Sequence, residues 1–304
     1  MTAELHEARA QAVLDELARQ MPFLRKAAEA GDPPLRERMP ALAAIAARLE
    51  ELDGSDWLQS SVKGYVALSL EFLTLQRRLE QTGRYLLSNE RDAFERVYSN
   101  PEVFSHYYLP GLLLSEALWP NHFAMNRLFV EAFVPKVPAG GRVLEVGVGT
   151  GYHLRELRER VPAMEYLGVD ISELAVAFAR RYADERGEGS MRFELANAAE
   201  RIPAADGWAD AAVCGEVLEH VEHPERLLSE IRRALKPRAP FFVTTVVFAA
   251  NVDHIYMFDS ADEIRELCRA GGWTLETDLV LPIYPTDSPD AVRRPMNYAA
   301  LLRA

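Results

Sequence analysis

The residues most able to do chemistry follow a short apolar stretch near the middle of the chain. Glu145 lies within this stretch, and glycines occupy every second position after it: Gly147, Gly149 and Gly151. A strand that turns into a helix through such glycines lets a ligand approach the bare backbone. A dinucleotide fingerprint would need a glycine where Tyr152 stands, which disfavours a nicotinamide-dependent oxidoreductase.

The second half of the chain predicts an alternation of strands and helices. Strands are expected at 142–146, 165–170, 191–195, 210–214 and 240–246, and helices at 152–161, 173–185 and 224–235. This order predicts a parallel sheet that is covered on both faces. Two final strands, at 274–283 and 297–303, are expected to form an antiparallel hairpin.

Ligands of an open parallel sheet lie beyond the carboxyl ends of its strands, and polar residues stand at several of these ends. Asp170 follows the second strand, where a carboxylate can accept hydrogen bonds from both hydroxyls of a ribose. Asn197 and Ala198 follow the third strand, where a polar side chain can meet an adenine edge. Glu216 and Val217 follow the fourth strand. The set predicts a site for a nucleotide-type ligand.

Several segments resemble the class I S-adenosylmethionine-dependent methyltransferases of the ubiquinone-biosynthesis and natural-product type. They are 145–151, 168–172, 216–221 and 228–237. The resemblance implies a Rossmann-like α/β fold, S-adenosyl-L-methionine as cofactor, and methyl transfer to a small metabolite or natural-product intermediate. It also implies that Glu145 and the glycines flank the methionine moiety, that Asp170 holds the ribose, and that Ile171 contacts the adenine.

The same cofactor pocket is compatible with a second chemistry. S-adenosylmethionine would then be the substrate itself, in an intramolecular cyclisation or an aminocarboxypropyl transfer that releases methylthioadenosine. Motifs for cofactor binding do not separate these reactions, because both bind the same molecule. A non-catalytic binding protein is a further alternative, which the intact glycines and Asp170 disfavour.

Methyl transfer requires mainly that the acceptor be aligned with the S–CH3 bond and that water be excluded. His254 is the predicted general base, because its unperturbed pKa lies near neutrality, and a hydrogen bond within its own loop is the alternative role. Tyr108 is the second catalytic candidate. The predicted acceptor-binding residues are Tyr107, Asn121, His122, Asp253 and Tyr256.

Glu216, Glu219 and His220 have the spacing that places side chains on one face of a helical turn. Two carboxylates and an imidazole there could bind a divalent cation, with His254 as a fourth ligand. The pattern resembles a set used by some metal-assisted methyltransferases. Helix-start electrostatics and contacts near the cofactor are the simpler explanation, so the sequence leaves a metal open.

Residues 1–136 are predicted to form a helical cap, and residues 137–304 the cofactor-binding domain. Apolar residues recur at helical spacing over 13–24, 42–52 and 58–79. Asn89 and Asp92 resemble a capping box that opens another helix. The aromatic segment 104–111 is expected to contain a turn, and a further helix is expected from 119 to about 133.

The composition of the chain disfavours some classes of binding partner. The formal net charge of −12 disfavours nucleic acid and anionic membrane surfaces, because proteins that bind polyanions carry basic faces. No signal peptide and no apolar run of roughly 20 residues is visible, which predicts a protein outside the membrane. Cys214 and Cys268 are expected to be buried, reduced thiols. These features predict a cytoplasmic monomer or homodimer that acts on a small molecule.

Overall fold

The amino-terminal part of the protein is helical. The computed structural model describes residues 3–161, 164–183, 191–284 and 293–304. The helices before the sheet are α1 (Ala3–Gln20), α2 (Pro22–Ala30), α3 (Leu35–Asp53), α4 (Trp57–Thr82), α5 (Glu90–Ala93), α6 (Pro101–Val103), α7 (Leu109–Leu118) and α8 (Pro120–Leu128). Among the described residues, no helix has the length and apolar character needed to cross a membrane.

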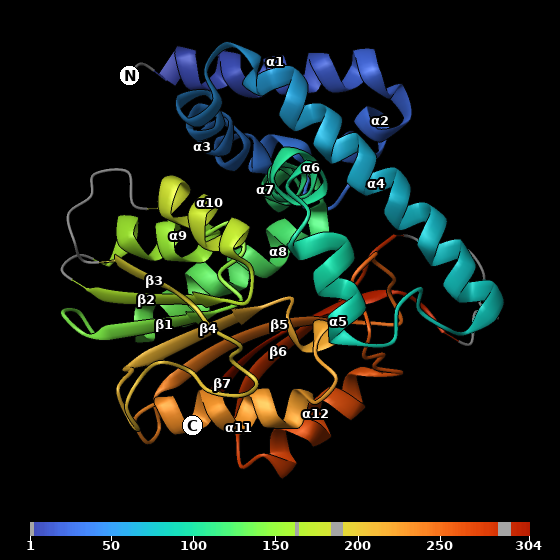
Figure 1. The fold of residues 1–304 in the computed structure, drawn as a ribbon. Helices are drawn as coiled ribbons and strands as arrows, with labels where there is room; N and C mark the ends of the chain where they lie inside the picture. The colour runs from blue at the N-terminus through green and yellow to red at the C-terminus, as the bar shows by residue number, and fades with distance from the viewer. Residues whose placement is uncertain (1–2, 162–163, 184–190, 285–292) are drawn as a thin grey trace.

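A mostly parallel sheet forms the carboxy-terminal part (Figure 1). Its strands are β1 (Arg142–Val146), β2 (Glu165–Asp170), β3 (Met191–Leu195), β4 (Ala211–Gly215), β5 (Pro240–Val247), β6 (Thr274–Pro282) and β7 (Met296–Arg303). Within the described ranges the strand order is β3-β2-β1-β4-β5-β7-β6, with β7 antiparallel to β5 and β6. The predicted α/β fold with a C-terminal antiparallel hairpin is confirmed.

Helices cover both faces of this sheet (Figure 1). They are α9 (Tyr152–Arg160) and α10 (Glu173–Ala183) on one face, and α11 (Pro224–Ala234) and α12 (Ala261–Ala270) on the other. Successive side chains of a strand point to opposite faces of the sheet. Val143 therefore packs with α9 and α10, while Leu144 packs with α11 and α12. The carboxyl ends of the parallel strands therefore meet at one edge, where a ligand can bind.

The helical segment packs directly against the sheet region. Tyr152, Phe178 and Tyr182, which belong to α9 and α10, lie in the same hydrophobic cluster as buried side chains of α1, α3, α4 and α7. Arg48 of α3 donates from Nε to the backbone carbonyl of Tyr182 at 3.1 Å. One shared apolar layer thus holds the helices over α9 and α10.

Helix α4 also holds the loop that follows β5. The buried Gln76 donates from Nε2 to the carbonyl of Phe248 at 3.2 Å, and its Oε1 accepts from the N–H of Ala250 at 2.9 Å. Both backbone groups are satisfied at a place where water could not replace the bonds. The loop that leads to Asp253 and His254 therefore starts from a fixed point on α4.

The apolar repeat over 13–24 spans two helices, because α1 ends at Gln20 and α2 begins at Pro22, where the first turn accommodates a proline. One expectation for the helical segment was wrong. The segment 104–111 is helical throughout, as a π-helical turn followed by the start of α7, whose first turn accommodates Pro110.

Capping explains two other outcomes. The Asn89 side chain accepts from the N–H of Asp92 at 2.8 Å, which confirms the predicted cap. The sequence interpretation missed α12, although the Ser260 side chain accepts from the N–H of Glu263, a capping signal that could have revealed it. Of the helix predicted at 173–185, residues 184–185 lie outside the described ranges.

Helices α4 and α7 cross closely because each carries a glycine at the contact. A Cβ on Gly64 would lie 2.6 Å from the carbonyl oxygen of Tyr107. A Cβ on Gly111 would lie 2.9 Å from the carbonyl oxygen of Gly64. Backbone meets backbone at this crossing, which fixes the height of Tyr108 above the sheet edge.

Replacing Gly64 by alanine tests this crossing. Alanine favours an isolated helix by about 1 kcal/mol over glycine, but its methyl group has no flexible neighbour to displace. We expect Gly64→Ala to lower the free energy of unfolding by about 2 kcal/mol, the usual cost of an overpacked core. Urea unfolding followed by circular dichroism measures it, with Lys63→Ala on the exposed side of α4 as the control. An unchanged or higher midpoint would contradict the close crossing.

Candidate active site

The loop between β1 and α9 holds its glycines in left-handed backbone conformations. Gly147 has a φ of +68° and Gly151 a φ of +77°, values that favour glycine. A Cβ on Gly147 would collide with the side chain of Val217 from the loop after β4. A Cβ on Gly151 would lie 3.1 Å from Ala179 on α10. Gly147 therefore shapes the space above the sheet, whereas Gly151 permits two helices to pack.

A cavity of about 250 Å³ lies at the carboxyl edge of the sheet. The predicted cofactor-binding residues that line it are Glu145, Gly147, Gly149, Asp170, Ile171, Asn197, Ala198, Glu216 and Val217. Gly151 lies outside the lining, because it faces α10. Aromatic side chains from the helical segment line the opposite part, among them Phe72, Phe104, Tyr108 and Trp119. One cavity thus joins the glycine loop to an aromatic surface.

Two acidic residues are fixed near the glycine loop. Asp170 accepts from the N–H of Gly149 at 3.0 Å and from the N–H of Ser172 at 2.9 Å. Burial raises the pKa of Asp170, and these N–H bonds oppose the rise. Glu145 is 2% exposed, with Oε1 at 3.2 Å from Nδ1 of His153, while its Oε2 has no hydrogen-bond partner among the described residues. That oxygen is available to a cationic group of a ligand.

Four of the predicted catalytic and acceptor residues line the cavity: Tyr108, His122, Asp253 and His254. The Tyr108 hydroxyl donates to Oδ2 of Asp253 at 2.8 Å and accepts from Nδ2 of Asn251 at 3.1 Å. Burial, together with the charge of Asp253, holds the pKa of Tyr108 well above its ordinary value. Tyr108 therefore acts as a protonated phenol.

The other three predicted acceptor residues do not reach the lining. The Tyr107 hydroxyl donates to Oε2 of Glu71 at 3.0 Å. Asn121 donates from Nδ2 to Oδ1 of Asn297 at 2.5 Å, so it supports a lining residue from behind. Tyr256 likewise lies outside the lining. Proximity in the sequence to Tyr108, His122 and Asp253 did not bring these side chains to the cavity.

Three histidines that line the cavity have shifted pKa values, and two of them, His122 and His254, are neutral at physiological pH. The third is His153: burial acts to lower its pKa, but the hydrogen bond to Glu145 and the charge of that carboxylate raise the pKa overall. Burial lowers the pKa of His122 to about 4. Burial, with a smaller contribution from His220, lowers the pKa of His254 to about 3. Nδ1 of His254 lies 2.7 Å from the carbonyl of Ala249, which is the hydrogen bond within its own loop that was the alternative role. A general base needs a pKa near the working pH, so this environment makes His254 a weak proton acceptor.

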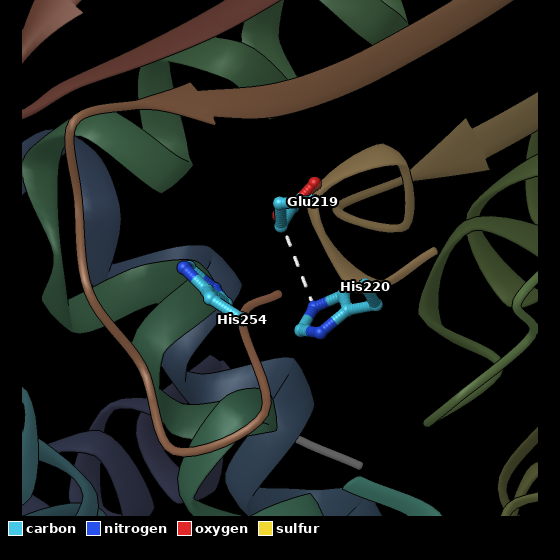
Figure 2. A group of neighbouring side chains, drawn as sticks. All are labelled: Glu219, His220 and His254. Atoms are coloured by element: carbon cyan, nitrogen blue, oxygen red, sulfur yellow. Dashed lines mark ion pairs between the residues drawn. The ribbon is translucent and has the colours of Figure 1, made fainter. Parts of the chain in front are cut away.

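Glu219, His220 and His254 converge at one part of the cavity (Figure 2). One ligand atom of each lies within 4.8 Å of the others. The expectation that Glu216 shares a helical face with Glu219 and His220 is wrong. Only a short 3-10 turn, Leu218–His220, forms there, and Glu216 precedes it with a φ of +51°. Glu216 instead accepts a hydrogen bond from Nδ2 of Asn297 at 3.3 Å.

The cavity is acidic. Its described lining includes no lysine or arginine, whereas the carboxylates that line it are Glu90, Glu116, Glu145, Asp170, Glu216, Glu219 and Asp253. Burial raises the pKa of Glu216 to about 7. Burial and the neighbouring charge of Glu216 raise the pKa of Glu219 well above its ordinary value. Such a space favours cationic groups and disfavours phosphate or carboxylate ligands.

The sequence interpretation missed Tyr98 and Asn297, which both line the cavity. The hydroxyl of Tyr98 lies 3.1 Å from Nδ1 of His220, although Tyr98 stands far upstream in a π-helical turn. No sequence pattern marks it. Asn297 is a fully buried amide in the apolar strand β7, and an isolated polar residue in such a strand is a signal that could have been used.

Comparison with known proteins agrees with the fold. Residues 144–243 match the family model described as Methyltransferase domain. A ubiquinone biosynthesis O-methyltransferase from Thiobacillus denitrificans is 37% identical over 108 residues, covering 36% of this chain and 45% of the relative. A demethylmenaquinone methyltransferase from Thermus thermophilus is 34% identical over 136 residues, covering 45% of this chain and 59% of the relative. The chain spans about half the length of the curated relatives it matches.

Solved structures agree at the level of the fold. Phosphoethanolamine N-methyltransferase 2 from Haemonchus contortus, in complex with phosphomonomethylethanolamine and S-adenosylhomocysteine, superimposes with a TM-score of 0.52 at 16% identity, over 72% of this chain and 61% of that chain. Residues 144–243 therefore match the methyltransferase domain family, and the chain has the fold of this methyltransferase structure.

Proposed function

We propose that this protein transfers a methyl group from S-adenosylmethionine to a small-molecule acceptor, a metabolite or natural-product intermediate. The observation that carries the proposal is a cavity that joins the glycine loop to an aromatic surface of the helical segment. Aromatic and aliphatic side chains in its lining help to exclude water, which methyl transfer requires. Relatives named for ubiquinone biosynthesis and for demethylmenaquinone support a ring-bearing acceptor, and the aromatic lining suits one.

The residues around the glycine loop fit the cofactor. When bound, S-adenosylmethionine supplies a methyl group on a positively charged sulfur. We assign the unpartnered Oε2 of Glu145 to its ammonium group, the remaining lone pairs of Asp170 to the ribose, and Asn197 to the adenine edge. Ile171 supports this assignment, since 37% of this apolar side chain is exposed beside the cavity and an adenine ring would cover it.

The proposal extends to the organisation of the chain. Residues 1–136 serve as the cap that supplies the acceptor side of the cavity, and residues 137–304 serve as the catalytic domain. Tyr108 and Asp253, which are joined by a hydrogen bond, orient the acceptor beside His254. The two free, buried cysteines fit a reducing compartment, which supports a place in the cytoplasm. The proposal takes the protein to be a monomer or a homodimer.

Gly147→Ala tests the cofactor site. The added methyl group would meet Val217, so the loop must shift, and we expect the affinity for S-adenosylmethionine to fall about 100-fold. Gly207→Ala is the matched control, because Gly207 has a similar φ of +63° but open space around its Cβ position. Isothermal titration calorimetry measures both variants. Equal affinities in the two variants would contradict the proposed place of the cofactor.

The reaction is tested by incubating the protein with S-adenosylmethionine and no acceptor, beside a heat-inactivated sample. We expect mass spectrometry to find intact cofactor that co-elutes with the protein. Release of S-adenosylhomocysteine on addition of candidate ring-bearing metabolites then identifies the acceptor. Methylthioadenosine that accumulates only with the active protein would mean that the cofactor is itself the substrate, and the proposal of methyl transfer would fall.

A further inference from the structure

Glu219 presents a buried oxygen that no described residue satisfies. The side chain is 0% exposed. Its Oε2 accepts from the hydroxyl of Thr245 at 2.6 Å, which fixes the orientation of the carboxylate. Its Oε1 has no hydrogen-bond partner and lies 3.9 Å from Nε2 of His220. A carboxylate oxygen held in this way is costly unless a cation or a donor meets it.

The two imidazoles beside Glu219 both have their Nδ1 atoms engaged. Nδ1 of His220 lies 3.1 Å from the backbone carbonyl of Asp253, and Nδ1 of His254 lies 2.7 Å from the carbonyl of Ala249. A carbonyl oxygen can only accept, so each Nδ1 carries the hydrogen and each Nε2 keeps its lone pair. Metal-binding histidines use this arrangement, in which a backbone carbonyl fixes the tautomer and the ring orientation.

The distances are close to those of a metal site. One ligand atom of each of the three side chains lies within 4.8 Å of the others, and Figure 2 shows the three side chains around a common space. Ligand atoms at about 2.0–2.2 Å from a divalent ion stand about 3–4 Å from one another. Small side-chain movements therefore close the site. No lysine or arginine of the described lining competes for Glu219.

We propose that Glu219, His220 and His254 bind one divalent transition-metal ion of the kind that prefers mixed imidazole and carboxylate ligands, such as Zn²⁺ or Co²⁺. Three protein ligands leave a coordination position open. Since the same cavity is the proposed acceptor site, that position is available to an acceptor oxygen, and coordination would ease the loss of its hydroxyl proton. Only this use of the ion rests on the proposed function; the binding itself does not.

Cobalt binding tests the site. The full chain is freed of metal by dialysis against a chelator and titrated with Co²⁺, whose visible absorption reports nitrogen and oxygen ligands, and bound metal is counted after gel filtration. We expect one ion per chain, displaced by Zn²⁺. Glu219→Gln and His254→Ala should each weaken binding at least about 100-fold. His223→Ala is the matched control, because this half-exposed histidine pairs with Glu225 and should leave binding unchanged.

Equal Co²⁺ affinity in the wild type, Glu219→Gln and His254→Ala overturns the proposal, as does a wild type that retains no ion. Circular dichroism and the affinity for S-adenosylmethionine establish that each variant is folded. If Glu219→Gln or His254→Ala does not fold, His220→Ala is measured in its place. Methyl transfer is measured separately. Transfer by a protein that binds no ion would refute this site alone, whereas one ion bound without any methyl transfer would refute the proposed function alone.

Discussion

A carboxylate that is buried away from water is stable only beside a donor or a positive charge. This constraint determines which ligand groups the cavity favours. Glu145, Glu216, Glu219 and Asp253 each keep one buried oxygen without a partner among the described residues. The described lining offers no lysine or arginine to meet them. Removing an ion from water costs several kcal/mol even after relaxation. Protonation relieves part of this cost, because burial raises the pKa of Glu216 to about 7 and that of Glu219 well above its ordinary value. Ligand groups with positive charge relieve more of it, and the proposed sulfonium cofactor near the glycine loop is such a group.

The helical segment determines how strongly this requirement acts. Its helices are held above the sheet by a continuous apolar layer and by the backbone-to-backbone crossing of α4 and α7. Because several charged side chains of the lining are buried, among them Glu145, Glu219 and Asp253, electrostatic interactions between them are less screened than at the surface. The helical segment supplies Tyr108, whose hydroxyl satisfies one oxygen of Asp253. Shape and charge of the site thus have a common origin in how these helices pack.

The sequence predicted the parts of the site that depend on local structure. The glycine loop, Asp170 and the strand ends could be placed because backbone conformation and strand order constrain them through neighbouring residues. The role of His254 as a base could not be judged, since its pKa depends on burial by segments distant in sequence. Tyr98 escaped for the same reason, because it reaches the cavity only through the packing of a π-helical turn. Asn297 stands out in its strand as a polar residue, but its place at the cavity depends on the pairing of β7 with β5.

The amide of Gln76 gives the fold a mechanical property. It bonds to the backbone on both sides of Ala249, so α4 and the loop after β5 must move together. Helix α4 runs from Trp57 to Thr82 over 26 residues, and side chains of its first half, from Trp57 to Leu68, pack in one hydrophobic cluster with α1 and α3. A rigid helix that tilts at one end also moves at the other. A displacement of α1 or α3 that tilts α4 would therefore shift the loop that carries His254, although no side chain of α1 or α3 lines the described cavity.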